Sequence, residues 1–167
     1  NNKRLGLGYA LKKGFKKAKK KYVLFLDADL SISKNDIIKL INKKKINTIV
    51  VGSRYTEKSK IEGASYIKVF LSKLLNVTIS KIFNIPISDI SHSFRIMSKN
   101  IPLNSKNYSH PGFFWETTIE AKKLNFKIEE IPIKFTERKY GTSKNKTLKM
   151  IKSVLKTICN LITVLND

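Results

Sequence analysis

Hydrophobic residues in this chain fall into short continuous runs and longer stretches with helical spacing. Residues 22–26 and 48–55 read as short strands buried on both faces, and the alternation over residues 127–135 predicts another strand. A polar loop over residues 85–97 runs into a further short strand. Apolar residues three or four positions apart predict helices over residues 5–20, 34–44, 65–83, 113–124 and 148–165, with Ser33 as an N-cap.

The helices predicted for residues 65–83 and 148–165 each carry a broad apolar face with lysines elsewhere. Packing of that face into the core is the default expectation. The alternative is a basic amphipathic helix that lies on a membrane surface. Residues 146–167 are expected to form a C-terminal amphipathic helix of a single domain that spans residues 1–167.

Composition limits the classes of protein and site. The chain of 167 residues is 41% hydrophobic, which fits one globular domain. Its lone Cys159 excludes an internal disulfide, and its two histidines exclude a histidine-rich zinc site. No apolar run is long enough to span a bilayer. Because the chain begins with Asn1 directly before a helical pattern, we expect a fragment that lacks its beginning.

The charge of the chain is strongly positive. The sequence has 34 Lys and Arg against 12 Asp and Glu, a net charge of +22. This excess favours an anionic partner, such as a nucleic acid, an anionic membrane or a phosphorylated substrate. An equally weighted alternative is codon bias, because the abundant Lys, Asn and Ile share AT-rich codons.

Two carboxylates, Asp27 and Asp29, directly follow the first apolar run. Strand alternation places both side chains on the same face of the strand. They lie at its carboxyl end, where open α/β sheets bind their ligands. Two neighbouring carboxylates repel each other, and a divalent cation would relieve that repulsion. All-oxygen ligands favour Mg²⁺ or Mn²⁺. The alternative is that Asp27 and Asp29 only cap the strand and the next helix.

Several other segments carry groups suited to phosphate. Gly6 and Gly8 precede the body of a helix, where bare amides approach a phosphate or form a tight turn. Arg54 at a strand end either pairs with a carboxylate or holds a phosphate. Polar and basic groups gather in residues 89–95 and 137–144, either as phosphate-binding loops or as solvated ones. Glu116 lies near a helix start, where the helix dipole alone would explain it.

The order of these segments resembles that of a known family. The motifs are Gly-Leu-Gly-Tyr-Ala-Leu-Lys-Lys-Gly, Leu-Phe-Leu-Asp-Ala-Asp-Leu-Ser, Val-Gly-Ser-Arg-Tyr, Ser-Asp-Ile-Ser-His-Ser-Phe-Arg, Phe-Phe-Trp-Glu, Ile-Pro-Ile-Lys-Phe and Arg-Lys-Tyr-Gly-Thr-Ser-Lys. In series they resemble the family-two glycosyltransferases, and within them the dolichol-phosphate (polyprenyl-phosphate) mannosyltransferase branch. The resemblance covers nearly the whole chain.

The resemblance implies an α/β, Rossmann-like GT-A fold. It also implies a metal-dependent, inverting hexosyltransferase at the cytoplasmic face of a membrane. Such an enzyme moves a sugar, mannose being favoured, from a nucleotide sugar to polyprenyl or dolichyl phosphate. GDP-mannose is the favoured donor and UDP-glucose a possible one. Two N-terminal strand ends of the family, of the Pro-Thr-Tyr-Asn-Glu and Asp-Asp-Gly-Ser types, do not occur here, so we expect an N-terminally truncated domain.

The resemblance also assigns roles to individual residues. Asp27 and Asp29 match the motif for the metal and the diphosphate, and Ser31 replaces a metal-contacting Gln of some members. Arg54 and Arg95 match arginines that face the acceptor phosphate. Ser91 and Ser93 lie in the segment just before Arg95. Arg138 and Lys144 match a basic loop that clamps the donor diphosphate. Glu116 matches a recurrent acidic position of the family.

Other interpretations stay open at this stage. The donor or acceptor could differ, and a sugar-hydroxyl acceptor would need a carboxylate base, for which Glu116 is the candidate. The charge also suits a basic nucleic-acid-binding domain. The sequence has no recognisable nucleic-acid-binding motif, however, and we expect no nucleic-acid partner. A third possibility is an inactive remnant with an exposed sheet edge.

Overall fold

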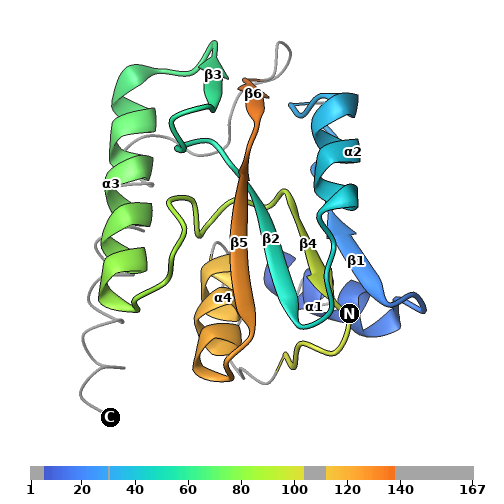
Figure 1. Ribbon diagram of the computed structural model, residues 1–167. Coiled ribbons are helices and arrows are strands. Elements are labelled where there is room, and N and C mark those ends of the chain that lie inside the picture. Colours follow the sequence, from blue (N-terminus) through green and yellow to red (C-terminus); the bar gives the residue numbers. More distant parts are fainter. Residues whose placement is uncertain (1–5, 30, 104–111, 138–167) are drawn as a thin grey trace.

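The computed structural model describes residues 6–29, 31–103 and 112–137 (Figure 1). Helices and strands alternate along most of the chain. In order they are α1 (Leu7–Lys17), β1 (Tyr22–Phe25), α2 (Lys34–Asn42), β2 (Thr48–Ser53), β3 (Lys60–Glu62), α3 (Tyr66–Ile82), β4 (Arg95–Ser98), α4 (Phe113–Lys123), β5 (Lys127–Pro132) and β6 (Lys134–Thr136). The predicted helix over residues 148–165 lies outside the described residues.

The strands form a mixed sheet in the order β1-β4-β2-β5. Strand β4 runs antiparallel to both β1 and β2, whereas β2 and β5 are parallel. Strands β1, β2 and β5 therefore point the same way, and β4 points against them. Strands β3 and β6 form a separate parallel pair. This α/β arrangement is the fold class that the sequence predicted.

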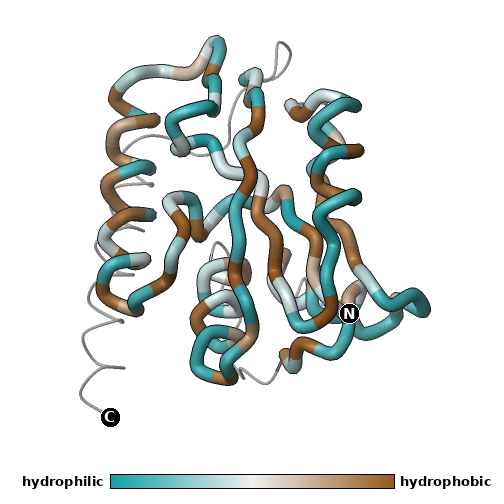
Figure 2. The backbone as a smooth tube through the Cα atoms, viewed as in Figure 1, coloured by the Kyte–Doolittle hydropathy of each residue, from teal (hydrophilic) through white to brown (hydrophobic). Residues whose placement is uncertain are grey.

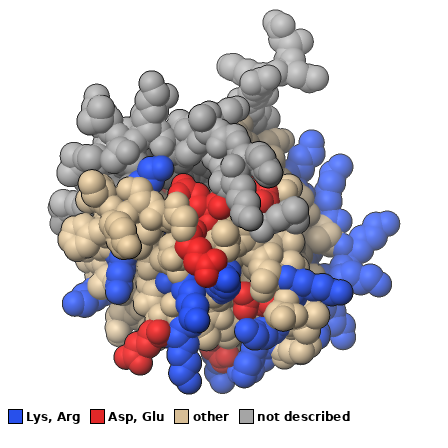
Figure 3. Space-filling model, turned by 90° about the horizontal axis from the view of Figure 1, so that it is seen from above, with Lys and Arg blue, Asp and Glu red and all other residues tan. Residues whose placement is uncertain are grey.

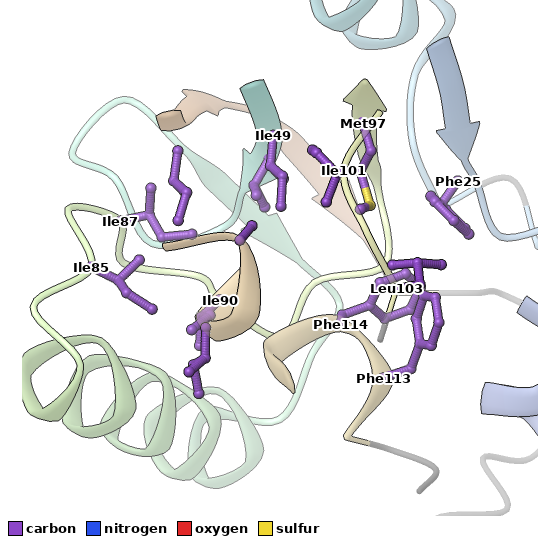
Figure 4. Packing of buried hydrophobic residues seen from close by; sticks show 14 of the residues in the cluster. Phe25, Ile49, Ile85, Ile87, Ile90, Met97, Ile101, Leu103, Phe113 and Phe114 are labelled. Atoms are coloured by element: carbon purple, nitrogen blue, oxygen red, sulfur yellow. The ribbon is translucent and has the colours of Figure 1, made fainter. Parts of the chain in front are cut away.

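Buried hydrophobic residues form two clusters, one on each face of the sheet. Figure 2 shows hydrophobic segments in the strands and in the helices around them. Ile49 of β2 points into the larger cluster, where Phe113 of α4 also lies (Figure 4). Val51 of β2 and Phe15 of α1 belong to the same cluster. Val50, between Ile49 and Val51 in sequence, points to the opposite face and packs in a cluster with Leu40 of α2. This alternation explains why every residue of β2 is buried.

Local sequence signals explain several element boundaries. Ser33 caps α2 as predicted, since its Oγ accepts a hydrogen bond from the backbone N–H of Asp36 at 3.1 Å.

The prediction that residues 22–26 are buried on both faces is wrong. Strand β1 lies at the edge of the four-stranded sheet, its first three residues are only half-buried, and Leu26 is 46% exposed.

Helix α3 differs most from its predicted packing. Residues on its apolar side face solvent, with exposed fractions of 92% for Tyr66, 66% for Ile67 and Phe70, and 54% for Leu74. Its buried residues are Asn76, Ile79 and Ser80. The expectation that the broad apolar face packs into the core is therefore confirmed for Ile79 and wrong for Ile67, Phe70 and Leu74. Among the described helices, none has both the length and the apolar character needed to cross a membrane.

Candidate functional site

A cleft of about 350 Å³ lies where strands β1 and β2 end. Because β4 runs against β1 and β2, the loop that precedes it meets the carboxyl ends of those strands. The loop and strand ends bring polar residues together that are far apart in sequence. The polar lining consists of Asp27, Asp29, Arg54, Ser72, Ser91, His92 and Ser93, and the apolar lining of Leu7, Leu11, Phe113, Phe114 and Phe135.

The two carboxylates of the sequence motif both line this cleft, as predicted, although they do so from a turn after β1 rather than from the strand itself. Their orientation is set by separate hydrogen bonds. The Ser93 hydroxyl donates to Oδ2 of Asp27 at 2.6 Å, and the backbone N–H of Ser31 donates to Oδ1 of Asp29 at 3.1 Å. Within residues 6–29, 31–103 and 112–137, no hydrogen bond to the second oxygen of either carboxylate is seen, so this oxygen can face a ligand.

This donor set fits Mg²⁺ or Mn²⁺ bound together with a substrate. The described residues contain no group of three or more His, Cys, Asp or Glu side chains that could hold a metal. Mg²⁺ is usually bound by one or two carboxylates, with water and substrate phosphates as its other ligands. Asp27 and Asp29 therefore suit a cation that arrives with a diphosphate, and do not suit a closed structural metal site.

Arg54 is held in the cleft by Asp89. Its Nε donates to Oδ2 at 2.8 Å, its Nη2 donates to Oδ1 at 2.9 Å, and its backbone N–H donates to Oδ2 at 3.0 Å. The Asp89 side chain is fully buried and that of Arg54 is 18% exposed. The pairing with a carboxylate, one of the two alternatives for Arg54, is therefore confirmed, and Arg54 also lines the cleft.

The buried ion pair fixes the charge of both partners. Burial alone would lower the pKa of Arg54 and raise that of Asp89. The attraction between them outweighs burial, so that the pKa of Arg54 is raised and the pKa of Asp89 is lowered. The cleft thus contains a guanidinium that stays positive and stays oriented. The Arg54 guanidinium also lies 5.0 Å from the ring centroid of Tyr55 and 5.7 Å from that of Phe135.

His92 contributes a neutral imidazole to the cleft wall. Its Nδ1 lies 2.6 Å from the carbonyl oxygen of Gly52. Since a carbonyl only accepts hydrogen bonds, Nδ1 carries the proton. Burial, followed by the positive charge of Arg54, lowers the pKa of His92 to about 4. His92 is therefore uncharged at neutral pH, and the sequence did not single it out.

Arg95 does not lie in the cleft, which corrects the expectation that it faces an acceptor phosphate. Its side chain is fully buried. The guanidinium donates to the carbonyl oxygens of Ile90, His92 and Phe114 at 2.6–3.1 Å. It also donates to Oγ1 of Thr118 at 2.7 Å and lies 4.8 Å from the Phe114 ring centroid. Burial lowers its pKa to about 9, so it remains positive at neutral pH. Arg95 joins the cleft loop to α4.

The remaining predicted residues are distributed differently. Gly6 is the exposed N-cap of α1 with φ 88°, and Gly8 is buried in that helix beside Leu7, which lines the cleft. Glu116 lies in the first turn of α4, and the cleft lining includes the earlier α4 residues Phe113 and Phe114 rather than Glu116. Arg138 and Lys144 lie outside the described residues.

Sequence reasoning also missed Ser72, which reaches the cleft from α3. Its helical position gave no distinct signal, because a serine among apolar residues is commonplace. Asp89 was recognised only as part of a polar loop. The signal that identifies it is Arg54, since an arginine at the end of a buried strand requires a partner once it is desolvated.

The sequence model of the family described as "Glycosyl transferase family 2" matches residues 1–102. The chain belongs to glycosyltransferase family 2. Its mixed α/β sheet agrees with the Rossmann-like GT-A fold expected for such a member. The polyprenol monophosphomannose synthase of Mycolicibacterium smegmatis is 26% identical to the chain over 144 residues, which make up 83% of this chain and 52% of that protein. The chain therefore spans about half the length of this curated relative.

Proposed function

We propose that this family-two chain carries the catalytic cleft of an inverting glycosyltransferase that transfers a hexose from a nucleotide sugar to a polyprenyl or dolichyl phosphate. The observation that carries the proposal is the meeting of Asp27, Asp29 and Arg54 in one cleft. Mannose is the favoured sugar, because the similar mycobacterial protein is named a polyprenol monophosphomannose synthase. GDP-mannose is accordingly the favoured donor, and UDP-glucose the second candidate.

The carboxylates serve the donor side of the reaction. Asp27 and Asp29, oriented by Ser93 and by the Ser31 amide, would hold Mg²⁺ or Mn²⁺ next to the donor diphosphate. A cation held by these two carboxylates would supply positive charge to offset the negative charge on the departing nucleoside diphosphate. Arg138 and Lys144, outside the described residues, are proposed to clamp the same diphosphate.

Arg54 serves the acceptor side. A lipid phosphate is already an anion, so it needs an oriented cation rather than a general base. Asp89 occupies Nε and Nη2 of Arg54, and within the described residues no hydrogen bond involves Nη1. A phosphate oxygen placed by Arg54 attacks the anomeric carbon as the bond from that carbon to the diphosphate oxygen breaks. The diphosphate leaves with the electron pair, and a single displacement inverts the anomeric centre.

The proposed location is the cytoplasmic face of a membrane, with peripheral attachment. A polyprenyl phosphate remains in the lipid phase, and the net charge of +22 favours contact with anionic lipids. Figure 3 shows Lys and Arg side chains gathered over the lower and right-hand parts of one face of the molecule, with Asp and Glu side chains among them.

A transfer assay tests the proposed function. The chain is incubated with Mn²⁺, labelled GDP-mannose and a detergent-dispersed polyprenyl phosphate, with UDP-glucose in a parallel reaction. We expect a lipid-linked sugar with inverted anomeric configuration, and a loss of about 100-fold or more in Asp29→Asn. Glu129→Gln, at a partly exposed position outside the cleft lining, is the matched carboxylate control and should retain activity. A product with retained configuration, or equal rates in the Asp29→Asn variant and the wild type, would contradict the proposal.

A further inference from the structure

His92 is held in the cleft wall by one side of its ring. Nδ1 donates to the carbonyl oxygen of Gly52, and only 6% of the residue is exposed. The rings of Phe94 and Phe135 lie nearly perpendicular to the imidazole, with centroids 6.5 Å and 6.0 Å from its own. These contacts fix the orientation of the ring, and the bond to Gly52 fixes its tautomer.

The other ring nitrogen of His92 faces the cleft. The two nitrogens of an imidazole point in divergent directions, so Nε2 points away from Gly52. In the part of the chain that the structure describes, no hydrogen bond to Nε2 is seen, and Nε2 is not one of the fully buried polar atoms that lack a partner. The small exposed part of this cleft-lining residue therefore includes Nε2. Because Nδ1 carries the proton, Nε2 presents a lone pair and can only accept a hydrogen bond.

His92 connects the two sides of the cleft to which the proposed function assigns phosphates. The next residue, Ser93, donates to Asp27 on the donor side. The Phe135 ring that contacts His92 also lies 5.7 Å from the Arg54 guanidinium on the acceptor side. The transferred hexose must lie between these sides, because its anomeric carbon is bonded to the donor diphosphate and is attacked by the acceptor phosphate.

We propose that His92 recognises the transferred hexose, with Nε2 accepting a hydrogen bond from one of its hydroxyl groups. This inference rests on the proposed function and deepens it, since it names a residue that determines which sugar is accepted. A fixed acceptor in a largely buried wall discriminates between sugars. A hexose that lacks the hydroxyl, or that directs it elsewhere, leaves Nε2 desolvated and unpaired.

A neutral imidazole suits a sugar better than a phosphate. Burial lowers the pKa of His92 to about 4, so the ring is uncharged at neutral pH. The lone pair on Nε2 would repel an ionised phosphate oxygen, whereas a hexose hydroxyl can donate to it. The partly buried Phe135 ring beside His92 also lines the cleft and offers an apolar surface to the C–H groups of a sugar.

Calorimetry on the full chain with Mn²⁺ tests this proposal by comparing GDP-mannose with GDP in wild type and His92→Asn. An Asn amide ends near the position of Nδ1, so it can donate to Gly52 but places no acceptor at the position of Nε2. We expect His92→Asn to weaken GDP-mannose binding by about three- to tenfold and to leave GDP binding unchanged. Equal affinities of the two proteins for GDP-mannose, or equal losses for GDP and GDP-mannose, would overturn the proposal.

The matched variant is His92→Gln, because its amide oxygen reaches the position of Nε2 but its amide does not replace the donor to Gly52. Thermal unfolding checks that both variants are folded. We expect His92→Gln to bind GDP-mannose more tightly than His92→Asn does. The reverse order would overturn the proposal, since it would assign the effect to the bond with Gly52.

Donor analogues that each lack one mannose hydroxyl identify the group that His92 contacts. For one analogue, we expect weaker binding than GDP-mannose in the wild type and no such loss in His92→Asn. Equal losses in both proteins for every analogue would overturn the proposal. If the wild type binds neither GDP-mannose nor UDP-glucose, the proposed function fails and the role of His92 fails with it. Nucleotide-sugar binding that is insensitive to His92 substitution removes only the role of His92.

Discussion

Arg54 and Asp89 form two parallel hydrogen bonds, of 2.8 Å between Nε and Oδ2 and 2.9 Å between Nη2 and Oδ1. The pair connects the end of β2 to the loop that precedes β4. It therefore joins two of the segments that build the cleft, and it keeps a positive charge in the cleft wall. A planar guanidinium suits this task because it can bind a carboxylate through two bonds at once.

Replacing Asp89 by Asn should destabilise the protein by about 3–5 kcal/mol, because it leaves Arg54 charged, largely desolvated and without its anionic partner. Urea denaturation at neutral pH measures this change in the free energy of unfolding. The control is Glu129→Gln, which removes the partner of Lys45 in a solvent-exposed pair and should cost no more than about 1 kcal/mol. Similar costs for the two substitutions would show that the buried pair has no special role.

Replacing Arg95 by Lys should cost about 3 kcal/mol of stability, although the charge is conserved. A lysine ammonium cannot reach the carbonyls of Ile90, His92 and Phe114 together, so buried acceptors lose their donor. The control is Lys134→Met. The native Lys134 side chain is half exposed and pairs with Glu62. If Arg95→Lys is as stable as the wild type, the guanidinium does not hold the loop to α4.

Gly52 and Gly14 should respond to alanine with opposite signs. A Cβ at Gly52 would clash with the ring of Phe94, whereas a Cβ at Gly14 within α1 meets no atom within 4 Å. We expect Gly52→Ala to lose about 1–3 kcal/mol through overpacking. Gly14→Ala should gain about 0.5–1 kcal/mol through helix propensity. Thermal unfolding of both variants tests this, and a stabilised Gly52→Ala would show that β2 and Phe94 are packed less closely than described.

His92 should make the stability depend on pH in the weakly acidic range. Its pKa is lowered to about 4 in the folded protein, so the unfolded chain takes up a proton first as the pH falls. Stability is therefore complete above about pH 6.5 and declines toward pH 4. The pKa of Asp89 is also lowered, and its contribution is lost only below the ordinary Asp pKa of about 3.9.

The measurement is the free energy of unfolding at several pH values between 7 and 4.5, for wild type and His92→Asn. An Asn side chain can donate to the Gly52 carbonyl but does not titrate. We expect a much smaller slope in the variant. Parallel slopes in the two proteins would assign the pH dependence to other groups.

Local sequence signals predicted the parts of the fold that depend on local physics. The Ser33 cap, the buried strand β2 and the carboxylates after β1 all follow from periodicity and from the chemistry of single residues. The orientation of α3 could not be predicted this way, because an apolar stripe does not reveal what lies against it. The side of α3 that faces the protein is held by a hydrogen bond between Asn76 and Ser91, fifteen residues apart, and that contact exists only in the folded chain.

The arginines show the same limit within the site. Arg54 and Arg95 each occur beside a strand end, and the sequence supports a phosphate contact for both. The fold separates them, since Arg54 reaches the cleft while Arg95 turns inward onto carbonyl oxygens. Ser72 could not be found either, because its helix comes to the cleft through tertiary packing alone.

Calorimetric titration tests most directly whether Asp27 and Asp29 bind a metal together with the donor diphosphate. GDP-mannose is titrated into the chain with Mn²⁺ and with a chelator, using wild type, Asp29→Asn and the control Glu129→Gln. We predict binding that requires Mn²⁺, persists in the control and is lost in Asp29→Asn. Binding that is equal with and without metal, or equal in Asp29→Asn and wild type, would contradict the assignment of this cleft.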